Sequence, residues 1–536
     1  MRGHTTLASG TTRTRRRSSR RAGQGSHSSS LAAQIRRISP AGWVALGAGV
    51  IALVMALQTL QGPSTDYDEG VYWQSLRAMA DGHALFSSVF SSQPPLFLLS
   101  VYPFYIVFGQ SLGAARIALI VFSLAGIAGT YVAGRALGHP AIGAVACLLL
   151  ALDTLFEHGA HTLQAELPSV ALQIWAVACA ILAMRANGRR RTWLVVGSGV
   201  LLGCALLIKL FAIVALVPIV LYLSLPLARR WLDKRGNLRW PARPEIWDSL
   251  RQIAPTLGWM FAGLFGCIVI VLLPFIGRLG VAYDQVVRFH LAAAQLDSHT
   301  LRDNLNLIGT TLWDARLVFI TVPAIVVIVW RRMWVTAPLI LWALVDFITL
   351  LRQQPLLDHH IVLLSPAMAL ITGCGVYAVW QAFTEPSSQR LAQTVTLVVL
   401  VAMCIAGLTL NWNQNLAANA PVPTRTLSMA LALQSVSAPD EVVLSDDQYV
   451  AALANRDVPP QLVDTSAVRI TSGYLTASQL EDYISSHRIH VILFASGRFD
   501  LLPGFRDWVA TRYTQVTTFD HNGALFLLEP VSNPPV

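Results

Sequence analysis

Apolar runs of about 15 to 21 residues recur along most of this chain, and short polar segments separate them. A helix of about 20 apolar residues is long enough to cross the hydrocarbon core of a bilayer. The pattern therefore predicts an α-helical polytopic membrane protein with about 11 transmembrane helices. The predicted spans lie at about 43–60, 115–134, 141–156, 167–184, 193–208, 210–227, 256–276, 316–330, 334–351, 361–380 and 391–410.

The composition supports a membrane protein and excludes a typical soluble enzyme. Of the 536 residues, 54% are hydrophobic and only 13% are charged, whereas soluble domains contain roughly 25% charged residues. The net charge of +10 would suggest a nucleic-acid partner in a soluble protein, but here it is typical of basic cytoplasmic loops. All six cysteines fall within apolar runs without CxxC spacing, so neither a disulfide framework nor a zinc site is indicated.

The distribution of Lys and Arg predicts the orientation in the membrane. Residues 1–40 are rich in Ser, Gly and Arg and contain no acid, so we expect a disordered cytoplasmic N-terminus. The basic segments at 185–191 and 229–251 fall in the cytoplasm only if the apolar run at 96–108 does not span. We therefore predict interfacial helices at 71–110. An odd number of spans then places the C-terminal region outside the plasma membrane.

The chain divides into three predicted regions: the N-terminal segment 1–40, a transmembrane catalytic domain at 41–410 and a C-terminal domain at 411–536. In the last region, 441–444, 491–494 and 526–528 are typical of short buried strands, and 478–486 is typical of a helix. Strands alternating with helices predict a small extracytoplasmic α/β domain.

An acidic cluster follows the first apolar run. Asp66, Asp68 and Glu69 lie within four residues, with Tyr67 and Tyr72 beside them. Charges at a membrane edge are costly and commonly functional, so we interpret the cluster as the source of a general base for sugar transfer at the outer face. The alternative is a solvated acidic loop.

Other ionisable residues fall on the same predicted face. A carboxylate can take a proton from an acceptor hydroxyl, and cations can stabilise a departing phosphate. Each residue also has a structural interpretation: a lysine can snorkel to the interface, an acid can begin a helix, and tyrosines can form an aromatic belt. The outer-face candidates are His161, Glu166, Lys209, Arg352, His359 and His360.

This pattern resembles the GT-C superfamily of polyprenyl-phosphate-sugar-dependent glycosyltransferases. The resemblance is carried by Asp68-Glu69 after the first span, Pro94-Pro95-Leu96 in an amphipathic stretch, Glu166 after the third span and Leu357-Asp358-His359-His360 before a late span. It is nearest to the branch that holds the protein O-mannosyltransferases and the lipid A aminoarabinose transferases, and it covers roughly residues 40–410.

The resemblance implies specific roles. Asp68 would be the base, with Glu69 orienting the acceptor or sharing that role, and Glu166 would be a second acid. The expected inverting reaction is a single displacement at the anomeric carbon. We assign the donor phosphate to Lys209, Arg352, His359 and His360. We assign acceptor or sugar contacts to Asp66, Tyr67, Tyr72 and His161.

The expected partners are a polyprenyl-phosphate-linked sugar, membrane lipids and a lipid, glycan or protein acceptor, with no nucleic acid. No cofactor is firmly indicated, although Asp68 and Glu166 could supply ligands to a divalent metal; His158 and His161 lack a clear third metal ligand. One alternative function is a transporter or flippase of a lipid-linked sugar, with Asp346 in a proton path. Another is a non-catalytic assembly subunit.

Overall fold

The computed structural model describes residues 39–64, 66–228, 243–296, 298–382 and 386–528. The chain from Ala41 onward forms one compact unit. Most of the predicted N-terminal segment 1–40 and the centre of the predicted basic loop at 229–251 lie outside the described residues.

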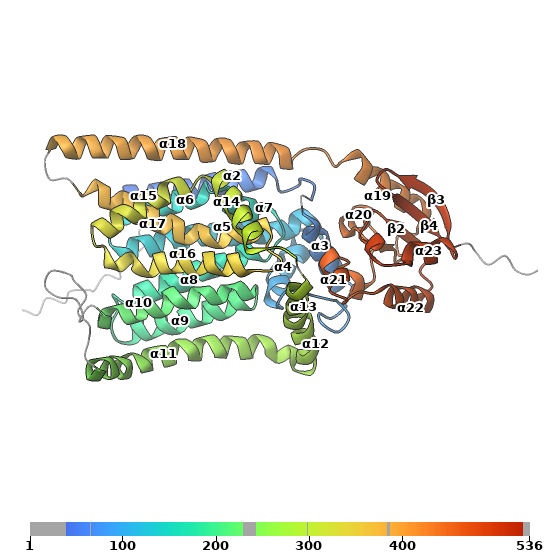
Figure 1. Cartoon of the computed structure of the whole chain (residues 1–536), viewed down its shortest axis with the longest axis horizontal. Helices are drawn as coiled ribbons and strands as arrows, with labels where there is room; N and C mark the ends of the chain where they lie inside the picture. Colours follow the sequence, from blue (N-terminus) through green and yellow to red (C-terminus); the bar gives the residue numbers. More distant parts are fainter. Residues whose placement is uncertain (1–38, 65, 229–242, 297, 383–385, 529–536) are drawn as a thin grey trace, which may run out of the picture. The chain divides into compact units, whose positions relative to one another are not determined.

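The long apolar helices form a bundle (Figure 1). Each of the eleven predicted spans overlaps one of them. The helices are α2 (Pro40–Gln58), α5 (Leu112–Leu137), α6 (Pro140–Ala151), α8 (Glu166–Ala183), α9 (Gly188–Leu206), α10 (Leu216–Ala228), α11 (Arg243–Leu272), α15 (Val318–Trp330), α16 (Ala337–Arg352), α17 (Ser365–Trp380) and α18 (Pro386–Ala418).

Within the described residues, eight helical segments are long and apolar enough to cross a membrane, or up to ten if each bent pair is one span. One bent pair joins α6 to α7 (Thr154–His161) at 61°, and the other joins α14 (Leu301–Ala315) to α15 at 94°. The predicted span 193–208 overlaps α9, which is not among these segments and carries three arginines in its first turn. The fold class of a polytopic helical membrane protein is confirmed.

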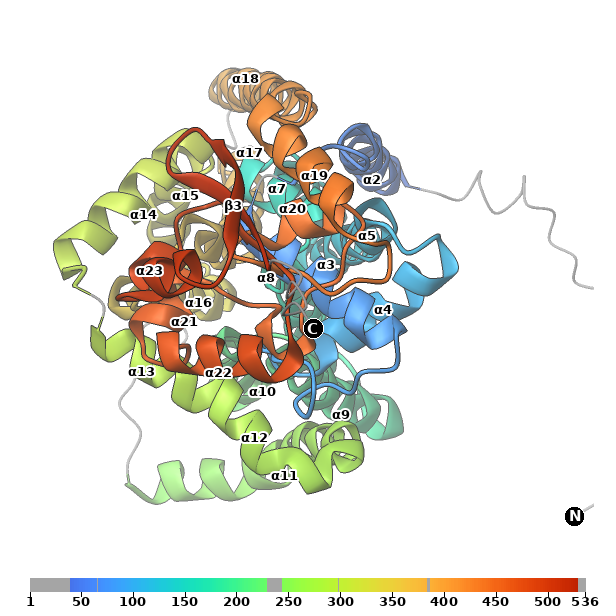
Figure 2. The same cartoon turned by 90° about the vertical axis from the view of Figure 1, so that its right-hand side faces the viewer.

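Close packing of small residues holds the bundle together. A Cβ on Gly134 of α5 would lie 2.5 Å from the Cα of Gly143 in α6. A Cβ on Gly199 of α9 would likewise overlap the Met260 carbonyl oxygen in α11. Such small residues let helix backbones approach closely where lipid offers no hydrophobic driving force. In Figure 2, α8 lies near the centre of the bundle, while α11 and α18 lie at its rim.

Shorter helices and 3-10 segments connect the long helices of the bundle. The α-helices are α3 (Tyr67–Ala80), α4 (Leu96–Val107), α12 (Leu279–Tyr283) and α13 (Phe289–Leu296). The 3-10 helices are Leu210–Ala215, Leu273–Arg278, Trp334–Thr336 and Asp358–Leu364, and Asp284–Arg288 is a π-helix. The helices α3 and α4 occupy the stretch predicted to be interfacial, and their position in the membrane interface stays a prediction.

The C-terminal region contains a four-stranded sheet of order β1-β2-β4-β3. The β1 strand is parallel to β2, and β4 is antiparallel to both β2 and β3. The strands are β1 (Leu444–Ser445), β2 (Val491–Phe494), β3 (Thr514–Phe519) and β4 (Gly523–Leu527). The helices are α19 (Thr424–Val436), α20 (Gln448–Leu453), α21 (Ala467–Thr471), α22 (Ala477–His487) and α23 (Phe505–Ala510), with 3-10 turns at Pro460–Leu462 and Phe499–Leu501.

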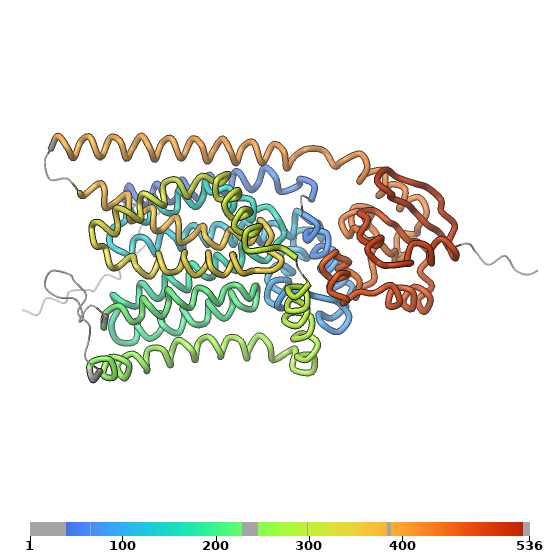
Figure 3. The backbone as a smooth tube through the Cα atoms, in the orientation of Figure 1, coloured from blue at the N-terminus to red at the C-terminus, as the bar shows by residue number. Residues whose placement is uncertain are grey.

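Helix α18 leads directly into this region (Figure 3). The predicted domain boundary at 410 falls inside α18, and the division into three domains remains a prediction. Contacts with α3 join the C-terminal region to the bundle. Arg77 pairs with Asp457 at 2.6 Å, and a Cβ on Gly70 would lie 2.5 Å from the Tyr449 nitrogen, so glycine allows α3 and α20 to touch.

Candidate active site

The N-terminus of α3 positions the acidic cluster. Asp66 adopts an extended backbone conformation at the N-cap, and its side chain accepts a hydrogen bond from the Asp68 backbone N–H at 2.8 Å. Acids in a first helical turn also favour the positive end of the helix dipole. Because residues four apart share a helix face, Asp68 and Tyr72 point into the same cavity.

This cavity, the Asp68 pocket, has a volume of about 350 Å³. Its lining combines ionisable groups from segments that are distant in the sequence with an apolar wall. The ionisable and polar lining includes Asp68, Tyr72, Gln93, Lys209, Arg352, His359, His360 and Asp464. The apolar lining includes Leu210, Phe211, Val286, Val287, Phe289 and Leu291.

Glu166 and Lys209 form a close ion pair at this pocket. The Lys209 Nζ lies 2.7 Å from Glu166 Oε1. Glu166 opens α8, and Lys209 lies in extended backbone between α9 and the following 3-10 helix. The imidazoles of His360 and His359 approach the same oxygen, with Nε2 at 3.6 Å and 3.8 Å. Glu166 therefore holds three nitrogen-bearing side chains together.

His359 connects this group to α3. Its Nδ1 lies 3.8 Å from Asp66 Oδ2 and 3.2 Å from Gln164 Nε2. His360 accepts a hydrogen bond at Nδ1 from the Leu357 backbone N–H at 3.2 Å. This contact assigns the proton of neutral His360 to Nε2, the nitrogen that faces Glu166.

The environment of Asp68 suits a base that works near neutral pH. Burial raises its pKa most, the nearby Asp66 and Asp464 carboxylates raise it further, and His359 and Lys209 lower it. The balance raises the pKa of Asp68 to about 7. A general base is most effective when its pKa lies near the working pH. Burial likewise raises the pKa of Asp66.

Glu69 lies outside the lining of the Asp68 pocket. Arg116 donates to it through Nη2 at 2.7 Å and Nε at 2.9 Å, and the Leu163 backbone N–H donates at 2.7 Å. Arg116 also donates to the carbonyls of Gly62 and Pro63. Both charged side chains are buried, so Glu69 ties α3 to α5 and to the preceding loop.

Two predicted acceptor contacts also lie outside the pocket lining. The Tyr67 hydroxyl hydrogen-bonds Thr465, and the Arg498 guanidinium lies 3.6 Å from the Tyr67 ring centroid. His161 is buried, with its Nδ1 3.5 Å from Glu157 Oε1. Asp66 is absent from the lining as well, but it reaches the site through His359.

A second cavity, the Asp314 cavity, adjoins the first. Its volume is about 310 Å³, and its lining includes Glu166 and His359, which also contact or line the Asp68 pocket. His158, Asp314 and Asp358 add polar groups. No Lys or Arg is among the described residues that line it. Glu166 and His359 thus lie between the Asp68 pocket, which contains both acids and cations, and a cavity that contains acids without Lys or Arg.

Sequence reasoning missed Asp464. This carboxylate belongs to the C-terminal region, is buried, and lines the pocket with Asp68 and Lys209. Its Oδ1 accepts a hydrogen bond from the Ser466 backbone N–H at 2.8 Å. No local motif marks it, because only the tertiary contact of the C-terminal region with α3 brings it to the site.

The metal ligands suggested by the sequence, Asp68 and Glu166, are not the group that the structure assembles. Among the described residues, Glu166, His359 and His360 offer ligand atoms within 4.8 Å of one another. However, the Lys209 ammonium already neutralises Glu166, and the inferred tautomer of His360 turns an N–H toward the cluster. A resident metal therefore fits this donor set poorly while Lys209 stays in place.

Comparison with known proteins matches residues 92–241 to the dolichyl-phosphate-mannose-protein mannosyltransferase family. None of the curated proteins matches the chain. ArnT from Cupriavidus metallidurans in the apo state is 15% identical, with a TM-score of 0.62 over 90% of this chain and 97% of that chain. ArnT bound to undecaprenyl phosphate is 15% identical, with a TM-score of 0.59 over 93% and 100%.

A third structure, the Archaeoglobus fulgidus oligosaccharyltransferase tethered with an acceptor peptide, is 13% identical, with a TM-score of 0.52 over 91% of this chain and 74% of that chain. At these identities the structural matches establish the fold. Together with the apolar helices and the family match, they confirm the resemblance seen in the sequence. The chain is an integral membrane protein with the fold of the GT-C glycosyltransferases, and its residues 92–241 match the dolichyl-phosphate-mannose-protein mannosyltransferase family.

Proposed function

We propose that this protein transfers a sugar from a polyprenyl-phosphate donor to an acceptor hydroxyl at the outer face of the membrane. The observation that carries the proposal is that Asp68 and Lys209 line one cavity, although they lie far apart in the sequence. A base and a phosphate-binding cation in one pocket are the two groups that such a transfer requires.

The cationic side of the pocket suits the donor. The Lys209 ammonium can bind the phosphate as a point charge, and the planar Arg352 guanidinium can bind it through two parallel N–H groups. His360 can donate a hydrogen bond to the phosphate from Nε2. The neighbouring wall of Leu210, Phe211 and other apolar side chains can hold the start of a prenyl chain. ArnT was solved with undecaprenyl phosphate bound, which supports a donor of this kind here.

The proposed reaction uses Asp68 as the base and Lys209 as the phosphate-binding cation. Asp68 takes the proton of the acceptor hydroxyl as the oxygen forms a bond with the anomeric carbon of the sugar. The bond from that carbon to the phosphate oxygen breaks, and the phosphate leaves with the electron pair. Lys209 stabilises the charge that develops on the phosphate. Attack from the side opposite the phosphate inverts the anomeric carbon in one step.

The remaining predicted residues take supporting roles in this proposal. Glu166 holds Lys209 and His360 in the geometry that receives the phosphate. Glu69 fixes α3 through Arg116, so that Asp68 keeps its position. Tyr72 lines the pocket beside Asp68 and can contact the sugar.

The test is transfer from a polyprenyl-phosphate sugar by the protein reconstituted in proteoliposomes. Asp68→Asn keeps the shape of the side chain but cannot accept the proton, so we expect the rate to fall about 10²–10⁴-fold. Asp81→Asn is the matched control, because Asp81 is exposed at the other end of the same helix. Full activity of Asp68→Asn would remove Asp68 from the mechanism.

Transport of a lipid-linked sugar is the second candidate, and one observation favours it. Asp346 is fully buried in α16, and neither of its carboxylate oxygens has a hydrogen-bond partner among the described residues. A buried carboxylate within a membrane span is commonly functional. Uptake into proteoliposomes without a covalent product, abolished by Asp346→Asn, would support transport instead of transfer.

A further inference from the structure

A third cavity, of about 440 Å³, lies where α2, α5 and α18 meet the C-terminal region. Three segments at helix ends form it: Gln61–Pro63 after α2, 111–113 at the start of α5 and 419–422 after α18. Trp73 of α3 and Tyr449 of α20 complete the wall. Because Trp73 lies on another face of α3 from Asp68 and Tyr72, this helix-end cavity is separate from the Asp68 pocket.

Hydrogen bonds from Arg116, which does not line the cavity, position part of the cavity wall. Arg116 donates to the carbonyls of Gly62 at 2.8 Å and Pro63 at 3.1 Å while it pairs with Glu69. A Cβ on Gly113 would lie 2.7 Å from the Gln61 side-chain amide. Glycine at this position therefore lets Gln61 lie against the start of α5. These partly buried contacts position the wall of the cavity.

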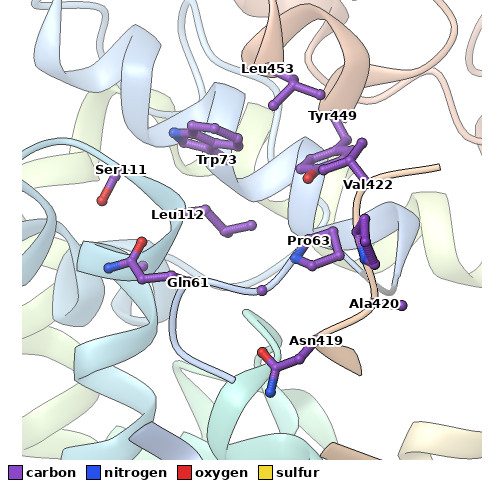
Figure 4. Close-up of a pocket in the computed structure, with 13 residues that line it drawn as sticks. Gln61, Pro63, Trp73, Ser111, Leu112, Asn419, Ala420, Val422, Tyr449 and Leu453 are labelled. Atoms are coloured by element: carbon purple, nitrogen blue, oxygen red, sulfur yellow. The ribbon is translucent and has the colours of Figure 1, made fainter. Parts of the chain in front are cut away.

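The lining has the chemistry of a site for an uncharged sugar. No acidic or basic side chain is among the described residues that line the cavity. Gln61 and Asn419 offer amides that both donate and accept hydrogen bonds, and Ser111 offers a hydroxyl. Figure 4 shows Trp73 and Tyr449 on one side of the cavity, and Gln61 and Asn419 on the other.

The two aromatic rings supply an apolar platform. Their centroids lie 6.2 Å apart and their planes are inclined by 45°. A sugar ring presents C–H groups on its faces and hydroxyls at its edge. Its faces can therefore pack on the aromatic rings while its hydroxyls hydrogen-bond to the amides. A phosphate, carboxylate or ammonium would instead lose its hydration without gaining a counter-charge.

Exposed apolar side chains lie on the two long helices, α2 and α18, whose ends lead into the lining of the cavity. Leu57 at the end of α2 and Leu416 at the end of α18 are 50% and 59% exposed, and Trp412 is 50% exposed. Exposed Trp side chains near helix ends are typical of the level of lipid headgroups. Acyl chains can therefore lie along α2 and α18 while a headgroup enters the cavity.

We propose that the helix-end cavity binds a membrane glycolipid with an uncharged sugar headgroup. The site is distinct from the transfer site, and the inference does not rest on the proposed transfer reaction. It predicts that binding requires the Gln61 and Asn419 amides and is independent of Asp68.

The test is native mass spectrometry of the full chain in a detergent without sugar, such as a dimethylamine oxide. The probes are monoglucosyl-diacylglycerol, phosphatidylglycerol and diacylglycerol with the same acyl chains. We expect the glucosyl lipid to bind about 10-fold more tightly than either control lipid, since several hydrogen bonds distinguish them. The double variant Gln61→Leu/Asn419→Leu should bind it about 10-fold more weakly.

Asn413→Leu is the matched control, because Asn413 is an exposed amide near the end of α18 that lines none of the described cavities. It should leave binding unchanged, as should Asp68→Asn. Equal binding of glucosyl lipid and phosphatidylglycerol would overturn the proposal. Unchanged binding in the double variant would overturn it too, even if transfer activity in the wild-type protein were established.

Discussion

The Lys209 ammonium lies 2.7 Å from Glu166 Oε1, and both side chains are largely buried. The pair joins the start of α8 to the break after α9, and it stands where the donor phosphate is proposed to bind. Two charges of opposite sign then compete for Lys209: the fixed carboxylate and the incoming phosphate. Because of this competition, substitution of Lys209 and substitution of Glu166 should reduce activity by different amounts.

Lys209→Met should lower kcat/KM for the lipid-linked donor about 10²–10³-fold, the range found when one group that stabilises a transition-state anion is lost. The substitution also leaves Glu166 as an unpaired buried carboxylate that repels the phosphate. Glu166→Gln should cost less, because it keeps the cation. Donor kinetics of both variants and of the double variant test this: purely additive losses would mean that the pair does not act as a unit.

The activity should depend on the protonation of Asp68. A base works only when deprotonated, so kcat/KM should rise with pH through the Asp68 pKa of about 7 and then level off. Asp464→Asn removes a charge that raises this pKa, so the rising limb should move to lower pH. A pH–rate profile measures the shift; an unmoved limb in Asp464→Asn would show that Asp464 does not act on Asp68.

The same pKa has a consequence for stability. Its folded value lies above the ordinary value of 3.8, so the fold favours protonated Asp68. The resulting contribution is fully present below pH 4 and is lost as pH rises through about 7. Asp68→Asn cannot ionise, so its thermal unfolding midpoint should change less between pH 5 and pH 8 than that of the wild-type protein. An equal change in both proteins would contradict this.

Much of the fold could be predicted because each span must satisfy its own backbone hydrogen bonds in lipid. This requirement turns every long apolar run into a helix, as the eleven overlaps show. The strand β3 was not predicted, because its Thr-Gln-Val-Thr-Thr-Phe sequence is mostly exposed and lacks an apolar face. Strand pairing with β4 decides its structure, and the local sequence does not.

The candidate site likewise contains residues that the local sequence could predict and residues that it could not. The spacing of Asp68 and Tyr72 on one helix face follows from local periodicity, and both line the pocket. Glu69, one residue further, is turned by about 100° and meets Arg116 instead. Sequence proximity to Asp68 could not separate these roles. The contribution of Asp464 depends on how the C-terminal region contacts α3, which no local pattern records.

The buried pair of Glu69 and Arg116 should matter for stability more than for chemistry. Glu69→Ala leaves a buried guanidinium without its carboxylate and should cost about 3 kcal/mol. Asp457→Ala, which removes the half-exposed partner of Arg77, is the matched control and should cost about 1 kcal/mol or less. Thermal unfolding in nanodiscs compares them. A Glu69→Ala protein of normal stability that fails in transfer would instead give Glu69 a direct catalytic role.

Removal of divalent metal should have little effect on transfer. The three candidate ligand atoms of Glu166, His359 and His360 lie within 4.8 Å, but Lys209 already provides a positive charge at the carboxylate. A second cation there would face repulsion from the ammonium. We therefore expect EDTA to change the rate by less than about 2-fold, because Lys209 and Arg352 can supply the charge that a metal would otherwise supply. A rate that collapses in EDTA and returns with Mn²⁺ or Mg²⁺ would show that Lys209 leaves Glu166 and that a metal takes its place.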